Sequence, residues 1–232
     1  MRNKIFRLIY LSCIWVFLPL LAHAELSSRE VWDNFKKLLE TGGYQVIGQE
    51  ISAGSDLSIK NVQISFEVDT QTDINFDISS VNLTKNEDGF IYIRLPEEIY
   101  VQYLNEDEFG YKTAANILVR ARQLEFKVSG RPFKFLYEIS ASSAGFVLVE
   151  LLDNGLPSSD FSSKMELVLA DINSTIAISE NATTEVKSLI SASGALIKGG
   201  VKLQSIPMEL NFQYVVDKLK SNSISNEPKV SM

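Results

Sequence analysis

The sequence predicts a mainly β fold: an antiparallel meander that forms a curved sheet or sandwich, with one N-terminal amphipathic helix packed on it. Three observations predict this fold. Apolar and polar residues alternate along most of the chain, and clear helical spacing is confined to one segment. Turn signals recur about every 10 to 15 residues, without regular helices between them. Alternation is typical of strands that bury one face, so the strands are expected to pair as antiparallel neighbours.

The N-terminal segment, residues 1–24, has the three parts of a secretory signal peptide. Basic side chains precede Leu8, an apolar stretch runs from Leu8 to Leu21, and the small residues Ala22 and Ala24 follow. The apolar stretch is shorter than the roughly 20 residues that cross a bilayer core, which disfavours a retained anchor. We therefore expect cleavage after Ala24 and a periplasmic location. Residues 25–220 are expected to form a single β-rich domain, and residues 221–232 a disordered tail.

Loss of the leader changes the charge and the chemical inventory of the chain. Removing 24 of the 232 residues leaves 208, and the leader holds three of the 22 basic side chains and none of the 29 acidic ones. The remainder therefore carries 19 basic and 29 acidic groups, a formal charge of −10. Such a charge opposes binding to nucleic acid or to an anionic membrane surface. The partners that remain are neutral, apolar or cationic.

Residues 28–41 are predicted to form the helix. Ser27 and Glu30 have the spacing of a capping box before it, and the pair Gly42-Gly43 follows it. Its apolar side chains recur at helical spacing, which indicates a face that packs on the core. That face contains Val31, Trp32, Phe35, Leu38 and Leu39.

The alternating segments after residue 43 are predicted to be strands with one buried face. The turns expected between strands lie at Asp88-Gly89, Ser129-Gly130 and Asn154-Gly155. The alternating residues are Val62, Ile64, Phe66 and Val68; Ile74, Phe76 and Ile78; Phe133, Phe135, Tyr137 and Ile139; Met165, Leu167 and Leu169; and Met208, Leu210, Phe212 and Tyr214.

Two segments allow more than one interpretation. Residues 111–128 fit two short strands, at 116–120 and 124–128, or one helix, and the strand interpretation is favoured. Residues 184–197 fit a short helix or a loop, because apolar residues cluster there without a sustained period and Gly194 interrupts them.

The chain without its leader offers few groups for catalysis. His23 and Cys13, the only histidine and cysteine, both lie in the leader. Triads and metal centres that need imidazole or thiolate are therefore excluded after cleavage. We expect no catalytic, cofactor-binding or metal-binding residue. The neighbouring acids at Glu97-Glu98, Glu106–Glu108 and Glu87-Asp88 are interpreted as solvated loop groups.

Five short motifs occur along the chain after the leader: the segment from Glu25 to Trp32, Gly42-Gly43-Tyr44, the Asp88-Gly89 hairpin, the step from Val128-Ser-Gly130 to Tyr137, and Leu169-Ala-Asp171-Ile172. Together they resemble an uncharacterised alphaproteobacterial family of exported proteins, domain of unknown function 2125. The resemblance spans most of the chain after the leader. It implies a Gram-negative periplasm and a β-rich body, it assigns no catalytic residue, and family members are generally longer.

Many one-faced strands with one covering helix point to a non-enzymatic function. Uncovered apolar surface usually marks a partner, so the first hypothesis is binding of a lipid-like or other apolar ligand on the curved sheet. The alternative is a structural or assembly protein of the cell envelope that acts through protein contacts at strand edges. A carboxylate-based glycan hydrolase is a distant third hypothesis.

Overall fold

The computed structural model describes residues 25–158, 161–180, 183–203 and 208–228. These residues form one 14-stranded antiparallel sheet and one helix, α2 (Ser28–Thr41). The predicted leader lies outside the described residues. The strands are β1 (Tyr44–Ala53), β2 (Asp56–Glu67), β3 (Thr72–Lys85), β4 (Ile91–Arg94), β5 (Glu98–Glu106), β6 (Lys112–Arg122), β7 (Glu125–Arg131), β8 (Lys134–Asp153), β9 (Leu156–Pro157), β10 (Phe161–Glu180), β11 (Thr183–Ala192), β12 (Gly194–Leu203), β13 (Met208–Val216) and β14 (Leu219–Pro228).

The sheet is a meander. We call each crossing of the sheet by the chain a pass, and each pass pairs with the pass that follows it. Some passes are one long strand, such as β8, and others are two consecutive short strands, such as β11 and β12, which pair with the two halves of a long strand. Strands β4 and β5 both pair with β3, β6 and β7 both pair with β8, and β11 and β12 both pair with β10. Strands β13 and β14 then pair with β12 and β11. The predicted antiparallel meander is confirmed.

Most passes bend or break along one line across the sheet. Non-glycine residues with positive φ mark this line at Asn61 (φ 51°), Gln123 (φ 51°) and Asp171 (φ 45°). A residue in this left-handed region turns the strand, so that two consecutive side chains point outward. Inward residues on the two sides of the line are then three positions apart, as Ile59 and Val62 are. The same spacing separates the buried pairs Ile78 and Val81, and Ala192 and Ala195.

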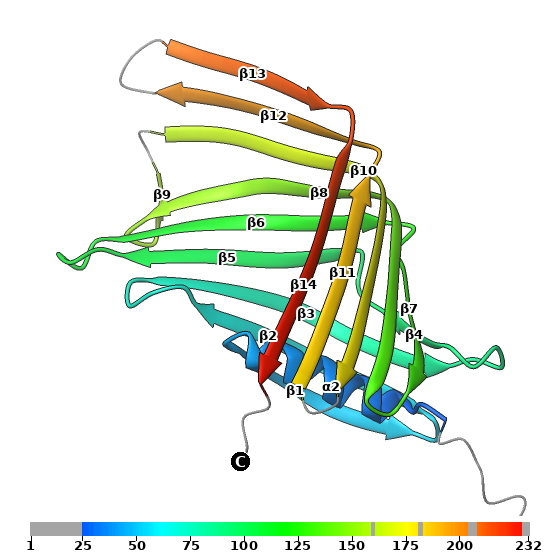
Figure 1. Ribbon diagram of the computed structural model, residues 1–232. Coiled ribbons are helices and arrows are strands. Elements are labelled where there is room, and N and C mark those ends of the chain that lie inside the picture. The colour runs from blue at the N-terminus through cyan, green and yellow to red at the C-terminus, as the bar shows by residue number, and fades with distance from the viewer. Residues whose placement is uncertain (1–24, 159–160, 181–182, 204–207, 229–232) are drawn as a thin grey trace, which may run out of the picture.

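The line divides the sheet into two walls that meet at an angle (Figure 1). The first wall contains residues 72–77 of β3, β5, β6, residues 143–153 of β8, residues 161–170 of β10, β12 and β13. The second wall contains residues 82–85 of β3, β4, β7, residues 134–141 of β8, residues 172–180 of β10, β11 and β14. We call the side of the sheet that carries the core cluster its inward face.

Helix α2 covers the inward face at the β1 end of the sheet (Figure 1). Its predicted capping box is present: the Glu30 N–H donates to Ser27 Oγ, and the Ser27 N–H donates to the Glu30 carboxylate. Gly42 caps the C-terminus, and Gly43 (φ 87°) takes the left-handed turn into β1. The predicted helix and its limits are confirmed.

The core cluster lies between α2, strands β1 to β3 and the second wall. Trp32 is 3% exposed, and Phe35 packs against the cluster, as predicted for this helix face. Members of the cluster come from the helix, from β1 to β4, from β7, and from parts of β8 and β10. They are Leu26, Val31, Trp32, Val46, Leu57, Ile59, Val62, Ile64, Ile78, Val81, Leu83, Ile91, Ile93, Phe126, Val128, Phe135, Tyr137 and Ile178.

Four predictions about local structure need correction. The turn expected at Ser129-Gly130 lies later, because Phe133 (φ 68°) occupies it and β8 begins at Lys134. Val68 lies beyond the end of β2 and is exposed rather than alternating into the core. Residues 184–197, expected to be a helix or loop, form parts of β11 and β12, because each half finds a partner in β10.

The tail expected from residue 221 is wrong as far as residue 228. Strand β14 pairs with β11 along ten positions, from Leu219 opposite Ala192 to Pro228 opposite Thr183. Pairing satisfies the backbone groups of this polar segment, which has too little apolar character to be recognised as a strand from its sequence. The segment 111–128 does form strands, β6 and β7, as favoured, although both are longer than expected.

Candidate binding surface

A row of six apolar side chains crosses the inward face of the first wall without interruption. Residues directly opposite one another in neighbouring strands share a face of the sheet. The strand register therefore places one residue from each of β5, β6, β8, β10, β12 and β13 in the same row. The row is Ile99, Val119, Phe146, Leu167, Ile197 and Tyr214.

Apolar and small residues flank this row on both sides. Nearer the bend, the neighbouring row is Ala121, Ala144, Leu169, Ala195 and Val216. Away from the bend, the neighbouring positions are Phe76, Val101, Ile117 and Leu148, and then Met165, Gly199 and Phe212. These three rows form the surface that we call the apolar rows. None of their members is charged.

Glycine at position 199 lets an aromatic ring lie directly on the backbone. A Cβ atom built on Gly199 would lie 2.1 Å from the ring of Phe212, which is far inside van der Waals contact. The Phe212 and Tyr214 rings are themselves 5.7 Å apart between centroids. An aromatic pair therefore forms the last part of the apolar rows, on β13.

The opposite face of the same strands mixes polar and apolar side chains. A chain of side-chain hydrogen bonds runs across its β5 end: Gln102 Nε2 donates to Asn116 Oδ1, and Asn116 Nδ2 donates to the Glu150 carboxylate. Toward β13, the register places Val168, Leu196 and Val215 in one row of that face. The inward face of the first wall is therefore the more continuously apolar of the two.

Coverage of the apolar rows falls from the β3 end to the β13 end. Val101 is buried, and its neighbours Phe76 on β3 and Ile117 on β6 are half-buried. On β13, Phe212 is 37% exposed and Tyr214 is 63% exposed. Helix α2 contacts β1, β2 and β3, and its polar bonds to β8 and β10 go to the second wall, so it does not cover the apolar rows on the later strands of the first wall. The rows are partly open to solvent there, as Phe146 (38% exposed) and Met165 (48% exposed) show, although Ala195 on β12 is buried beside the bend.

On the second wall, the inward side chains change from apolar to hydroxyl groups between β8 and β14. From β8 through β10 to β11, one inward row runs Tyr137, Ile176, Ser188 and then Ser223 on β14. The rows beside it also end in serine on β14, at Ser221 and Ser225. Ser188 Oγ and Ser223 Oγ are 2.8 Å apart and hydrogen-bonded. Hydroxyl groups thus line the inward side of β14, on the same face as the apolar rows.

A polar network buried under α2 holds the helix on the second wall. Tyr137 Oη donates to Asn34 Oδ1 at 2.6 Å, and Asn34 Nδ2 donates to Glu180 Oε1 at 2.9 Å. Lys37 pairs with the other carboxylate oxygen of Glu180 at 2.9 Å. Burial, and then the charge of Glu180, raise the pKa of Tyr137 well above its usual range. A tyrosine that keeps its proton and has its partners inside the fold has a structural role.

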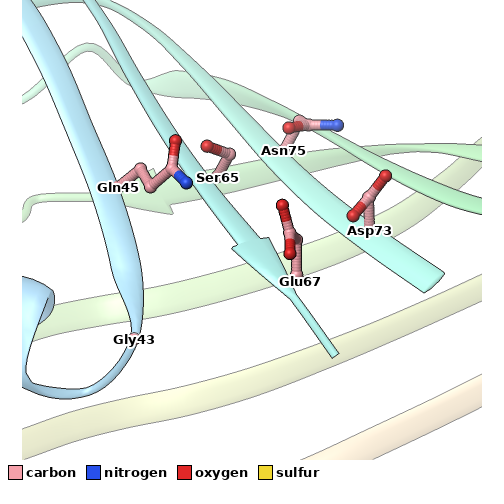
Figure 2. A pocket seen from close by; sticks show the side chains of 6 residues that line it. All are labelled: Gly43, Gln45, Ser65, Glu67, Asp73 and Asn75. Carbon is pink, nitrogen blue, oxygen red and sulfur yellow. The ribbon is translucent and has the colours of Figure 1, made fainter. Parts of the chain in front are cut away.

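A small pocket of about 270 Å³ lies on the outward side of β1, β2 and β3 (Figure 2). Glu67 and Asp73 stand opposite each other in the register, as do Ser65 and Asn75, and Gln45 completes the polar side chains. In the described parts of the chain, no group of three or more His, Cys, Asp or Glu side chains is arranged to hold a metal ion. The pocket is a polar recess with no nucleophile and base in contact.

The acidic pairs noted in the sequence lie apart from one another and from this pocket. Asp88 accepts hydrogen bonds from the Phe90 N–H and the Tyr92 hydroxyl in the β3–β4 turn. Asp107 caps its own turn by accepting from backbone N–H groups of residues 109 and 111. Glu98 and Glu106 form exposed ion pairs with Arg120 and Lys112. The structure therefore uses these acids in turns and cross-strand pairs.

Comparison with protein-family models, curated proteins and solved structures gives no match for this chain. The resemblance to domain of unknown function 2125 therefore stays a prediction. Within the described residues, no helix has the length and apolar character required to cross a membrane. The function is therefore inferred from the geometry of the sheet.

Proposed function

We propose that the chain is exported and acts in the periplasm as a non-enzymatic protein that binds a lipid-like apolar ligand on the inward face of its sheet. The observation that carries this proposal is the unbroken row from Ile99 to Tyr214, which is half-buried at Ile99 and reaches 63% exposure at Tyr214. A contiguous apolar surface that the protein does not cover itself favours a ligand or partner.

Ligand chemistry follows from the residues of the open surface. The apolar rows provide aliphatic and aromatic groups, which gain about 25 cal/mol for each Å² of apolar area removed from water. They offer no charged group to orient an ionic substrate. Binding through such a surface is driven by burial and has little directional specificity. This chemistry suits a long hydrocarbon chain better than a sugar, nucleotide or peptide.

The proposal is tested with N-phenyl-1-naphthylamine, a neutral dye that becomes fluorescent in apolar surroundings. The purified protein without its leader is expected to enhance the fluorescence, and Tyr214→Asp is expected to weaken dye binding by about tenfold or more, because a carboxylate opposes apolar burial. Val215→Asp is the matched control. Val215 neighbours Tyr214 on β13, is 65% exposed against 63%, and points to the opposite face. Absence of dye binding, or equal losses in both variants, contradicts the proposal.

The assembly hypothesis has one specific observation in its favour. Strand β13 pairs with β12 alone, so its other edge is unpaired within the described residues. Val215 and Val216 add exposed apolar groups on both faces beside that edge. An edge of this kind can accept a strand from another chain. Analytical ultracentrifugation separates the hypotheses: a monomer that binds the dye supports ligand binding, and a concentration-dependent oligomer that does not bind it supports assembly.

A further inference from the structure

Among the side chains that the structure describes, the inward surface of β11 to β14 contains no charge. On β11 and β14 the described inward side chains from residue 186 to residue 225 are apolar or hydroxyl groups, and on β12 and β13 the described inward residues are Ala195, Ile197, Gly199, Phe212, Tyr214 and Val216. The described lysines of these strands lie on the other face: Lys187 is opposite Ile224, Lys198 is opposite Gln213 and Glu166, and Lys220 is opposite Ser191. A phosphate drawn onto this surface would find no cation, and removing an unpaired charge from water is costly.

Hydroxyl groups occupy the place where a lipid head group would meet the second wall. Ser221, Ser223 and Ser225 form a line along the inward side of β14, and Ser188 on β11 bonds to Ser223. Each hydroxyl can donate one hydrogen bond and accept others. Such groups suit ester carbonyls and free hydroxyls, which need partners but carry no charge.

The length of the open surface matches one acyl chain. Its central row contains Phe146, Leu167, Ile197 and Tyr214, one residue from each of four adjacent strands. Strands lie about 4.8 Å apart, so three intervals span about 14 Å. A bilayer core is about 30 Å thick and holds two leaflets, so a chain from one leaflet spans about 15 Å. A membrane lipid chain laid across the strands would therefore fill this row.

We propose that the ligand is an uncharged glycerolipid, whose acyl chain lies along the apolar rows and whose ester and hydroxyl groups contact the serines of β14. This inference rests on the proposed function, since it names the class of lipid that the same surface binds. It adds selectivity: the surface discriminates against lipids with an anionic head group.

The test displaces N-phenyl-1-naphthylamine from the protein without its leader by two lipids with identical acyl chains. Dioleoylglycerol is uncharged, and dioleoylphosphatidylglycerol carries one phosphate charge. Dioleoylglycerol is expected to displace the dye at a concentration at least about tenfold lower. Ser223→Lys, which places a cation inward on β14, is expected to abolish or reverse this preference. Asn222→Lys is the control, because Asn222 stands opposite Leu189 on the outward side of the same strand.

Each outcome decides one of the two proposals. If the dye binds but both lipids displace it equally, or the phosphate lipid is preferred, the selectivity inference is wrong while binding of apolar ligands stands. Displacement by neither lipid also overturns the inference. An unchanged preference in Ser223→Lys removes the role of the serine line. Dye binding is measured before the lipid comparison. If the dye does not bind, the proposed function is wrong, and the inference that rests on it is wrong as well.

Discussion

Two side chains of α2 connect the helix to strands that are distant in the sequence. Trp32 Nε1 donates to Glu50 on β1 at 2.9 Å, while Asn34 lies between Tyr137 of β8 and Glu180 of β10. The hydrogen bond from Trp32, more than the ion pair with Arg29, lowers the pKa of Glu50 despite partial burial. Polar contacts therefore fix the helix to β1 on one side and to β8 and β10 on the other, in addition to the burial of its apolar side chains.

Tyr137→Phe is expected to destabilise the protein by about 1 to 3 kcal/mol, because Asn34 Oδ1 would lose its buried donor. The loss should depend on pH. The folded chain holds the Tyr137 proton to a higher pH than the unfolded chain, whose tyrosines ionise near pH 10. Stability from this group is therefore complete below about pH 10 and falls as the pH rises further.

Urea titrations at pH 7 and at about pH 10.5 measure both effects. The wild type should lose more stability between these pH values than Tyr137→Phe does. Tyr100→Phe serves as the control, since Tyr100 is 55% exposed and its substitution should change stability by less than about 0.5 kcal/mol. An identical pH dependence in wild type and Tyr137→Phe would show that the tyrosine is not buried under the helix.

At the scale of single elements, the bend in each pass determines which residues face inward. Asn61 on β2 has a positive φ of 51° and an exposed side chain, and the adjoining inward residues Ile59 and Val62 are fully buried. Opposite it on β1, a Cβ atom at Gly48 would lie 2.6 Å from the Ile59 side chain. The bend at this place needs one residue that tolerates the left-handed region and one without a side chain.

Asn61→Val is expected to cost about 1 to 2 kcal/mol, because a β-branched residue is strained at positive φ. Asn61→Gly is the matched variant and should be neutral or slightly stabilising, since glycine adopts this conformation freely. Thermal or urea unfolding measures the difference. Equal stability of the two variants would contradict the bend at this residue.

The strands could be predicted from sequence, but the bends could not. Alternation of Ile74, Phe76 and Ile78 gives a strand whichever wall it joins, and the capping residues Ser27 and Glu30 give the helix start. The left-handed turns at Gln123 and Asp171 have no local signature, because polar residues of this kind are also common on exposed strand faces. Strand β14 was missed because its pairing with β11, and not its own composition, makes it a strand.

At the scale of the whole molecule, both walls share the same strands. Strands β3, β8 and β10 each run through the bend and contribute residues to both walls. The sequence predicted an apolar face in excess of what one helix could cover, and this part of the candidate surface could be anticipated. Its location could not, because the order of exposure from Val101 to Tyr214 depends on which passes α2 contacts.

We expect the protein to unfold in one transition, because β3, β8 and β10 each run through both walls and the walls cannot separate from each other without breaking these strands. In protein produced without the predicted leader, which contains the other tryptophan, Trp15, the fluorescence of Trp32 reports the covered end. Far-UV circular dichroism reports the whole sheet. The two midpoints in urea should coincide within error. A second transition in the dichroism signal, after or before that of Trp32, would mean that the open end unfolds independently.

The meander also determines the order in which strands can pair while the chain folds. A chain that emerges from its N-terminus can add each pass to the one before it, because the partner of every pass is its neighbour in sequence. Pairing partners are then close along the chain, which favours rapid folding for a β protein. The growing sheet has two edges: β1, which pairs with β2 alone in the described residues, and the newest strand, which changes as the chain lengthens. An unpaired edge can pair with another chain, so the second site at risk of aggregation moves along the sequence as folding proceeds.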